Sequence, residues 1–474
     1  MYTKLIINNE YVETARYSTI NDPEDGSVVG NLANATKTEV DRTFSSAKAA
    51  FSTWKNIPAH ERLFKLEQVA GALLTKKNEI AATMVAEIAK PLKDCVKEVE
   101  RSAEYILFTI QAYRTLEGRV LDGDKMPGYN QSQKTAFVTY EPMGVILAIS
   151  PFNYPINLAI TKIAPALAAG NCVILKPSTA GAISAYLMSE IFAGIFPPGV
   201  YSFISGKSSE IGDYVVTHPD VSMIAFTGST ATGRHIQHLA SAPIYLEMGG
   251  KDAAVVFADA DLDRAVSEIT KGAFSYSAQR CTAVKRVIIE ESIAEEFISK
   301  LKIKVSELKI GSAKQNADIT PIVSSATVDY LKELSEDAIS KGANVMCGNI
   351  YEGNYAHPTI FDRVTKEMRL YREEPFGPLL PIIRVADYDE AIAVANDSEY
   401  GLQADIFTQD VNKAFSAARS LNAGTVQING KSDRGPDNFP FPGIKDSGMG
   451  VAGLKDAILS MVRTKVIVLN SEWS

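Results

Sequence analysis

Apolar residues recur at helical spacing through the first quarter of the chain. Thr36 and Glu39 have the spacing of a capping box, which marks the start of a helix. Apolar side chains then return every three or four positions, at Val40, Phe44, Ala47, Phe51 and Trp54. Further long amphipathic patterns cover residues 59–118. We expect all of these segments to be helices that pack against a sheet.

Beyond these helices, short apolar runs alternate with helical segments, which is the pattern of parallel strands joined by crossover helices. The first set of runs covers residues 145–149, 173–175, 201–204 and 223–226. A second set, which includes residues 253–257, 286–289 and 379–383, begins around Glu247. The pattern predicts two α/β units that meet near Glu247.

Two further runs, residues 135–140 and 465–469, fit neither set and are candidate edge strands. Residues 1–10 are typical of a short strand and lack the hydrophobic region of a signal peptide. The most apolar tract, residues 144–170, is interrupted by polar residues and prolines, namely Pro151, Asn153, Pro155, Lys162 and Pro165. These interruptions exclude a simple membrane span.

Composition narrows the possible partners. With 474 residues, the chain suits two large domains and an appendage. A net charge of -8 without a long basic run argues against nucleic acid but leaves anionic small substrates open. The four widely separated cysteines indicate reduced thiols in a cytoplasm. His235 and His238 have no third ligand at a recognisable spacing, so we predict no metal site.

Three polar residues carry the candidate chemistry. Cys281 precedes Thr282, Glu247 ends an apolar run before two glycines, and Asn153 stands between two prolines. A thiol nucleophile, a carboxylate base and an amide donor suffice for covalent catalysis at a carbonyl group. A lone cysteine is more often a small buried hydrophobic residue, so the three residues are informative only together.

These stretches resemble the aldehyde dehydrogenase superfamily, and the resemblance covers nearly the whole chain. The non-phosphorylating glyceraldehyde-3-phosphate dehydrogenase branch is most similar, through QRCTAVKR at 279–286, EEPFGP at 373–378 and DRGPDNFPF at 433–441. The resemblance implies an α/β fold with a Rossmann-type cofactor domain at residues 1–128 and 144–246. It also implies an α/β catalytic domain at residues 247–432. A small β oligomerisation arm at residues 129–143 and 455–474 would then join the subunits of a homotetramer.

Two glycine-containing segments are candidates for the cofactor loop. Residues 226–233 follow a predicted strand and open a predicted helix, whose free amides can bind a pyrophosphate. Gly228 allows a tight turn there, and Gly233 allows close packing. The segment also resembles the family's cofactor loop. A stricter GxGxxG at 448–453 follows a proline-rich loop, so we interpret it as a structural loop.

The residues after Lys176 bear on the choice of cofactor. In NAD-using relatives a glutamate commonly lies three residues after this lysine and binds the adenosine ribose, whereas this chain has Thr179. Without that carboxylate, Lys176 and a hydroxyl can attract a 2′-phosphate, so NADP is predicted over NAD. A turn rich in serine and threonine is the alternative interpretation. The resemblance implies further cofactor contacts at Ser150, Ser178, Asp213, Ser229, Glu374 and Phe376.

Substrate identity depends on arginines. Arg101, Arg280 and Arg434 match the positions that bind the substrate phosphate in the branch, and Tyr154 and Thr282 flank the catalytic residues. Three guanidiniums on one pocket would form a dianion site. Two departures make the substrate less certain than the reaction. Ala278 replaces a usual glycine, which strains the loop if the position needs a positive φ, and residues 430–433 replace an amide-rich run.

The resemblance implies NADP-dependent oxidation of glyceraldehyde 3-phosphate to 3-phosphoglycerate, a step related to glycolysis. Cys281 would add to the aldehyde, with its pKa depressed by Arg280 or a helix end, and Asn153 would hold the oxyanion. Glu247 would activate the water that hydrolyses the thioester. One alternative is an NADP-dependent semialdehyde dehydrogenase acting on succinate semialdehyde or a similar small aldehyde. A catalytically inactive binding protein is another, but the intact catalytic residues argue against it.

Overall fold

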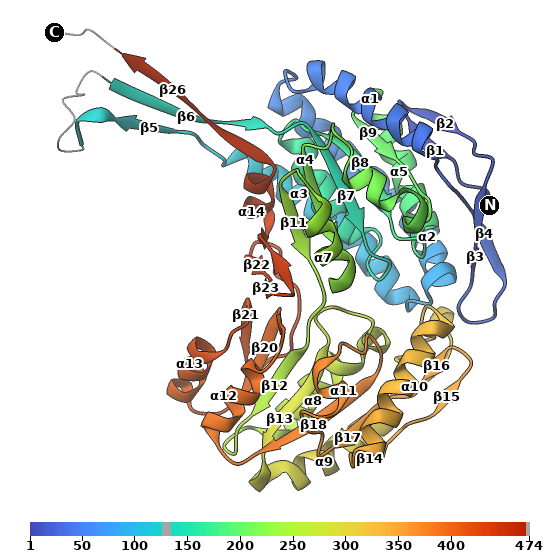
Figure 1. Cartoon of the computed structure of the whole chain (residues 1–474), viewed down its shortest axis with the longest axis vertical. Helices are drawn as coiled ribbons and strands as arrows, with labels where there is room; N and C mark the ends of the chain where they lie inside the picture. Colours follow the sequence, from blue (N-terminus) through green and yellow to red (C-terminus); the bar gives the residue numbers. More distant parts are fainter. Residues whose placement is uncertain (126–133, 471–474) are drawn as a thin grey trace.

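The computed structural model describes residues 1–125 and 134–470, which form two α/β units and a protruding three-stranded sheet (Figure 1). The chain passes from the last parallel strand of the first unit, β11 (Ile244–Glu247), to the first strand of the second, β12 (Asp252–Val256). Glu247 therefore lies at the carboxyl end of a strand, where the two sheets approach each other.

The first sheet has eight strands in the order β2-β1-β9-β8-β7-β10-β11-β24. Its centre is parallel from β9 to β11, and the strands at both edges are antiparallel. The remaining strands are β1 (Leu5–Ile7), β2 (Glu10–Val12), β7 (Val145–Ser150), β8 (Cys172–Pro177), β9 (Tyr201–Phe203), β10 (Met223–Thr227) and β24 (Gly448–Met449). All four runs of the first predicted set form strands of this sheet.

Seven helices belong to the first unit among the described residues. They are α1 (Lys37–Trp54), α2 (Ala59–Ile88), α3 (Leu92–Arg114), α4 (Asn157–Ala168), α5 (Ala182–Ile195), α6 (Asp213–Val216) and α7 (Thr230–Leu239). The predicted capping box at Thr36 and Glu39 begins α1, which packs on β7 and β8. The expectation that the next helices also cover the sheet is wrong in part, because α2 and α3 pack mainly on α4 and α5 and form a second layer.

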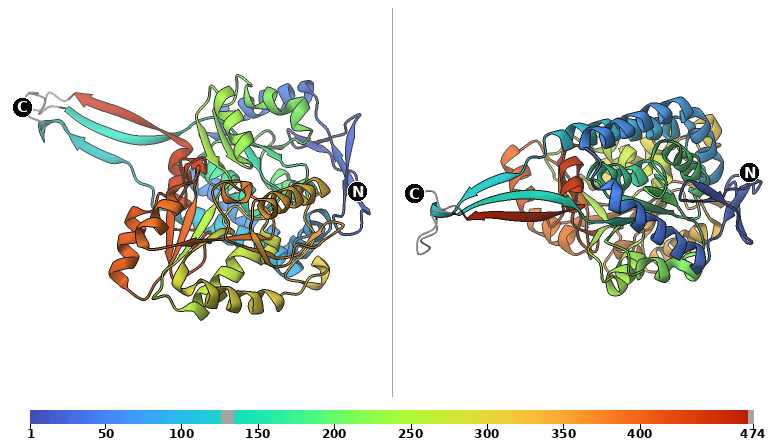
Figure 2. Two further views of the ribbon diagram at one scale, coloured as in Figure 1. Left: turned by 60° about the horizontal axis from the view of Figure 1, so that its bottom comes forward. Right: turned by 90° about the horizontal axis from the view of Figure 1, so that it is seen from above.

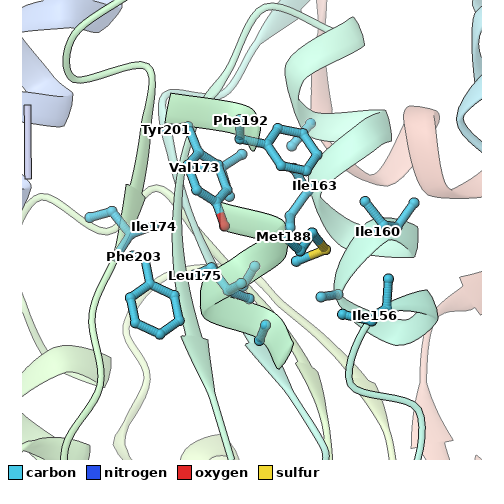
Figure 3. Close-up of a cluster of buried hydrophobic side chains, with 14 of the residues drawn as sticks. Ile156, Ile160, Ile163, Val173, Ile174, Leu175, Met188, Phe192, Tyr201 and Phe203 are labelled. Atoms are coloured by element: carbon cyan, nitrogen blue, oxygen red, sulfur yellow. The ribbon is translucent and has the colours of Figure 1, made fainter. Parts of the chain in front are cut away.

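The core of this unit lies between β8 and the two helices beside it. Figure 3 shows Ile156, Ile160 and Ile163 of the α4 region, and Met188 and Phe192 of α5, around Leu175 and its neighbours on β8. These side chains are fully buried. This packing fixes the carboxyl end of β7 and the loop that leads into α4, which contains Asn153.

The second sheet has seven strands in the order β14-β17-β18-β13-β12-β20-β21. They are joined in parallel except for the antiparallel edge strand β14. Its strands besides β12 are β13 (Val284–Glu290), β14 (Asn344–Cys347), β17 (Thr359–Asp362), β18 (Leu379–Val385), β20 (Gln403–Phe407) and β21 (Thr425–Ile428). The predicted runs near 253, 286 and 379 are β12, β13 and β18.

Seven helices accompany the second sheet or follow it within the described residues. They are α8 (Leu262–Phe274), α9 (Glu291–Ser306), α10 (Ser325–Ser340), α11 (Arg369–Arg372), α12 (Tyr388–Asn396), α13 (Val411–Ser420) and α14 (Leu454–Ser460). Short two-stranded sheets are formed by β3 (Tyr17–Asn21) with β4 (Val28–Ala33), β15 (Tyr351–Glu352) with β16 (Tyr355–Ala356), β19 (Tyr400–Gly401) with β23 (Ile444–Lys445), and β22 (Phe441–Pro442) with β25 (Val451–Ala452).

A three-stranded antiparallel sheet extends away from both units (Figure 2). It consists of β5 (Arg119–Asp122), β6 (Lys134–Pro142) and β26 (Val462–Asn470). Both candidate edge strands are therefore strands, and they pair with each other. Exposed apolar side chains line this sheet: Val120, Leu121, Phe137, Val466, Ile467, Val468 and Leu469. Residues 129–133 and 471–474 of the predicted arm lie outside the described residues. No described helix is long and apolar enough to cross a membrane.

Candidate active site

Cys281 follows a strained turn. The short helix η3 (Ser275–Ala278) ends with Tyr276, Ser277 and Ala278 at φ values of 52°, 50° and 59°. A left-handed conformation costs an L-residue about 1–2 kcal/mol, and Ala278 adopts it where relatives are expected to have glycine. The hydroxyl of Ser277 holds the turn by donating to the Thr320 carbonyl at 2.7 Å and accepting from its amide at 2.9 Å. The strain considered for Ala278 is therefore present.

The thiol of Cys281 is not activated in this state. Burial raises its pKa to about 11, and Lys285 and Arg434 are the nearby positive charges that oppose this effect. Arg280, from which a contribution was expected, is not among the largest influences on this pKa. The charge of Glu247 also raises the Cys281 pKa, so the carboxylate acts electrostatically on the thiol.

Asn153 lies beside the same turn. Its side-chain Nδ2 donates to the Gln279 carbonyl oxygen at 2.9 Å, two residues before Cys281. The backbone amide of Cys281 donates to no group within the described part of the chain. An amide side chain and a free backbone amide therefore lie near the thiol, which is the arrangement that an oxyanion requires.

Glu247 is held by four polar neighbours. It accepts from the hydroxyls of Thr227 at 2.6 Å and Tyr245 at 2.7 Å, and Arg434 binds both carboxylate oxygens at 3.0 and 3.2 Å. Lys162 lies 3.7 Å away. Burial alone would raise the pKa of Glu247, but Arg434 and Lys162 outweigh burial and lower it to about 2. The carboxylate is therefore ionised at neutral pH.

The three candidate substrate arginines are not equivalent. Arg101 donates to the Arg434 carbonyl oxygen at 2.7 Å and forms two bonds to Asp437, at 2.7 and 3.2 Å. Arg280 is buried, donates to the Gly272 carbonyl oxygen at 2.6 Å, and has a buried Nε without a partner in the described structure. Arg101 of α3 is thus bonded to the loop that contains Arg434 and Asp437, whereas Arg280 is bonded to Gly272 at the end of α8. Tyr154 and the buried Thr282 lie next to Asn153 and Cys281 in the chain.

Glu374 lies at the crevice between the two sheets. Its Oε1 accepts from the Gly250 amide at 3.1 Å and pairs with Lys285 at 3.1 Å. A Cβ on Gly249 would meet Glu374 Oε2, so the glycine lets this carboxylate approach the chain closely. Phe376 has a φ of 49° and packs edge-on against Phe152, with ring centroids 5.8 Å apart. Both residues of the expected Glu-x-Phe motif therefore lie close to the catalytic elements.

An open cleft of about 520 Å³ runs along the first sheet beside α7. Lys176 and Asp213 both line it, as do Ser208, Thr232 and His235. A carboxylate oxygen of Asp213 lies 2.8 Å from the Nε2 atom of His235, within hydrogen-bonding distance. The structure thus brings together two predicted cofactor residues that are far apart in sequence.

Lys176 is buried and has only a long hydrogen bond, of 3.4 Å, to the Ser208 hydroxyl. Burial lowers its pKa to about 8, because no carboxylate compensates it. Nearby, the Ser150 hydroxyl is buried without a partner in the described structure, the Ser178 amide donates to the Ser150 carbonyl at 2.9 Å, and Thr179 is exposed. A buried ammonium without an anion suits an anionic ligand.

The two glycine segments differ as predicted. Residues 226–233 join β10 to α7, and Ser229 caps that helix by accepting from the Thr232 amide at 3.4 Å. Cβ atoms on Gly228 and Gly233 would clash with Phe226 and Met248, so both glycines allow close packing. Residues 448–453 instead form β24 and β25, and β24 pairs antiparallel with β11 at the sheet edge. The segment is therefore structural, as interpreted, but it forms two short antiparallel strands where a loop was expected.

Several polar residues at the site were not predicted from the sequence. They are Lys90, Thr227, Tyr245 and Lys285, which contact the site residues, and Ser208, Thr232 and His235 in the cleft. Lys162 interrupts an apolar tract, and a charge in such a place is a signal of a buried partner. The seven residues named above stand in ordinary polar sequence, so nothing in the neighbouring sequence marks them as part of a site. Within residues 1–125 and 134–470, no group of three or more potential metal ligands is present.

Known proteins are similar to this chain in fold and in sequence along nearly their whole length. A model of the "Aldehyde dehydrogenase family" matches residues 11–467. An NADP-dependent glyceraldehyde-3-phosphate dehydrogenase of Streptococcus equinus is 47% identical over 98% of each chain, and one of Pisum sativum is 45% identical over 91% of this chain and 88% of the plant protein. The crystal structure of an NADP-dependent glyceraldehyde-3-phosphate dehydrogenase from Bacillus halodurans C-125, complexed with NADP, has a TM-score of 0.98 and 45% identity, covering 99% of each chain.

Proposed function

Because the chain belongs to the aldehyde dehydrogenase family, we propose that it oxidises glyceraldehyde 3-phosphate to 3-phosphoglycerate with NADP. The observation that carries this proposal is the Asn153 amide beside the turn that leads to Cys281, together with an ionised Glu247 whose charge acts on the thiol. Arg434 binds Glu247, and Arg101 of α3 is bonded to the loop that contains Arg434. Those groups supply what covalent oxidation of an anionic aldehyde requires.

In the proposed mechanism, Cys281 is the nucleophile. Its thiol loses a proton, which the charges of Lys285 and Arg434 favour, and Sγ bonds to the aldehyde carbon. The side chain of Asn153 and the Cys281 amide donate to the oxygen that becomes negatively charged. When bound, NADP supplies the acceptor for the hydride that leaves the carbon. A thioester on Cys281 remains.

Glu247 is the proposed base for thioester hydrolysis. The carboxylate accepts a proton from water, the resulting hydroxide bonds to the thioester carbon, and the Cys281 sulfur leaves as 3-phosphoglycerate is released. Since Glu247 is bound by Arg434 in the structure described, the side chain must turn away from that guanidinium first. Gly249 and Gly250 follow Glu247 directly, and glycine backbones adopt a wide range of conformations, which favours this movement.

The residues of the open cleft fit NADP. The buried ammonium of Lys176 has no anionic partner, and the buried hydroxyl of Ser150 has none at all among the described residues. We propose that Lys176, Ser178 and Thr179 bind the adenosine ribose and its 2′-phosphate. Gly228, Ser229, Gly233 and Asp213 would lie along the rest of the dinucleotide, and Glu374 with Phe376 would hold the nicotinamide ribose.

The proposed substrate site contains Arg101, Arg280, Arg434, Tyr154 and Thr282. Arg101 and Arg434 already pair with carboxylates, so a substrate phosphate must compete with Asp437 and Glu247 for their guanidiniums. A dianion can do so, because it carries more charge than either carboxylate and presents three acceptor oxygens. Competition for Arg434 would also free Glu247 for its role as base.

We propose a homotetramer in the cytoplasm. The exposed apolar residues of β5, β6 and β26 form a surface that another subunit could cover. All four cysteines are free, which is typical of a reducing compartment.

A substrate panel tests the proposed function. Purified protein would be assayed with glyceraldehyde 3-phosphate, succinate semialdehyde, lactaldehyde and simple aldehydes, each with NADP and with NAD. The highest kcat/KM is expected for glyceraldehyde 3-phosphate with NADP. A preference for succinate semialdehyde would favour the semialdehyde dehydrogenase instead, and no turnover of any aldehyde would refute an enzymatic role.

A further inference from the structure

A buried ion pair lies behind the loop that contains Asn153. Lys90, just after the end of α2, pairs with Glu98 of α3, and each side chain is only 1% exposed. Burial alone would lower the pKa of Lys90, but Glu98 raises it above its ordinary value, so the ammonium stays charged. Two charges in such a place are costly unless their remaining hydrogen-bonding groups are satisfied. Their other contacts therefore indicate what the pair does.

Those contacts converge on the loop between β7 and α4. Glu98 Oε1 accepts from the amides of Ile156 and Asn157 at 2.9 and 3.0 Å. Lys90 Nζ donates to the Asn153 carbonyl oxygen at 3.0 Å and lies 3.5 Å from the centre of the Tyr154 ring. The ion pair thus fixes both ends of the segment that presents the proposed oxyanion donor.

The same lysine also touches the turn before Cys281. Its Nζ is 5.1 Å from the centre of the Tyr276 ring, and the Tyr276 hydroxyl donates to the Ile88 carbonyl at 3.4 Å. Tyr276 begins the left-handed run that leads to Cys281. Because Asn153 Nδ2 binds the Gln279 carbonyl, Lys90 lies where the nucleophile loop and the oxyanion loop join.

A second buried glutamate shows that helix capping alone needs no lysine. Glu87 accepts from the amides of Ile183 and Ser184 at 3.0 and 2.8 Å at the start of α5. No lysine, arginine or histidine pairs with Glu87 in the described part of the chain, and burial raises its pKa to about 7. Glu98 caps α4 in the same way, but it also forms an ion pair with Lys90. The contacts of Lys90 with Asn153 and Tyr154 go beyond the cap.

We propose that Lys90, held by Glu98, is a positioning residue that sets the side chain of Asn153 relative to Cys281 during formation of the thioester. The inference rests on the proposed function. Lys90 acts through the Asn153 backbone and the Tyr154 ring, without contact to the reacting atoms. A displacement of about 1 Å at such a donor can slow a reaction by up to roughly 100-fold.

The test uses the double variant Lys90→Met/Glu98→Gln in the full-length protein. The glutamine keeps an oxygen that can accept from the α4 amides, and the replacement of both charges leaves no unpaired ion. Thioester formation is measured as the NADPH burst after rapid mixing with glyceraldehyde 3-phosphate. NADP affinity, the melting temperature and the rate of Cys281 alkylation by iodoacetamide are measured in parallel. Glu87→Gln is the matched control, since it changes a buried cap that lacks a lysine.

We expect the double variant to form the thioester at least about tenfold more slowly. NADP affinity and alkylation should stay within about twofold of wild type, and Glu87→Gln should keep the wild-type burst rate. In an Asn153→Ala background the same double replacement should slow the burst less than about threefold, because the group being positioned is absent. A folded double variant with a wild-type burst rate overturns the proposal, and so does an undiminished effect in the Asn153→Ala background.

Two outcomes need separate interpretation. If the double variant does not fold, Glu98→Gln alone is measured in both backgrounds, and an equal slowing with and without Asn153 overturns the proposal. If the wild type forms no NADPH from glyceraldehyde 3-phosphate, either in a burst or at steady state, the proposed substrate is wrong. The variants are then compared on whichever aldehyde gives a burst, where the same two results decide the role of Lys90.

Discussion

Replacement of Lys176 by methionine should separate NADP binding from NAD binding. Methionine has a similar length but no charge, so the buried position stays filled while the ammonium is lost. In the structure this ammonium has only a 3.4 Å hydrogen bond to Ser208. We expect the 2′-phosphate of NADP to be its main partner, and NAD lacks that phosphate.

The expected change in the Kd of NADP follows from the loss of one hydrogen bond to a charged group. Hydrogen bonds to charged groups contribute roughly 1.5–3 kcal/mol. Loss of one such bond should therefore raise the Kd of NADP by about 10- to 150-fold. The Kd of NAD should change less than about twofold, since its adenosine ribose has no 2′-phosphate for the ammonium to bind.

The pKa of Lys176 adds a pH dependence. Burial lowers that pKa to about 8, so the free protein loses the Lys176 proton as the pH rises above 8. A bound phosphate favours the charged form and raises the pKa again. NADP binding above pH 8 must then take up a proton, and its Kd should increase by up to about tenfold per pH unit. NAD binding should not show this dependence.

Titration calorimetry with NADP and NAD between pH 6.5 and 9.5 would measure both effects, and buffers of different ionisation enthalpy would report the proton uptake. Lys48→Met is a suitable control, because Lys48 is an exposed lysine of the same unit that pairs with Asp220. Equal changes in NADP and NAD affinity in Lys176→Met would refute the reasoning. A pH-independent ratio of the two Kd values in the wild type would do so as well.

Four further measurements probe the other site residues. Thr179→Glu should lower the NADP-to-NAD ratio of kcat/KM at least about tenfold, because a carboxylate would repel the 2′-phosphate, and an unchanged ratio would exclude this turn from cofactor choice. Glu247→Gln should give a burst of NADPH and then stall as the thioester, whereas a steady wild-type rate would contradict its role as base. Arg434→Ala should lower kcat/KM for glyceraldehyde 3-phosphate by about 10- to 100-fold, with a smaller loss for unphosphorylated glyceraldehyde because Arg434 also lowers the Cys281 pKa; equal losses would indicate general damage. Alkylation of cofactor-free Cys281 should accelerate by about tenfold per unit between pH 7 and 10, since its pKa is about 11, and a plateau below pH 9 would argue against a protonated resting thiol.

Features determined by nearby residues could be predicted from the sequence. The capping box at Thr36 begins α1, and the apolar runs near 145, 173 and 223 became adjacent parallel strands because their burial on both faces needs continuous apolar sequence. The place of α2 and α3 could not be predicted, because amphipathicity shows that a helix has a buried face but not what covers that face.

The electrostatics of the site depend on contacts that are distant in sequence. Arg434 and Glu247 are 187 positions apart, and only the folded chain shows that the proposed phosphate-binding residue holds the proposed base. The direction in which Arg280 points could not be predicted either. Its guanidinium is buried against the Gly272 carbonyl, and no pattern in the neighbouring sequence indicates that contact. The left-handed φ of Ala278 could be anticipated only through the resemblance to relatives with glycine.

The protruding sheet has a consequence for biosynthesis. In its register Arg463 of β26 pairs with Glu141 of β6, although the two residues are 322 positions apart. At about 5–20 residues per second, a ribosome needs roughly 15–65 s to reach β26 after it has made β6. During that time β6 has one edge without its partner strand, and Phe137 has no neighbour on β26. The nascent chain should therefore depend on chaperones most while the residues between β6 and β26 are being made, and assembly of the proposed tetramer should begin only after synthesis of β26.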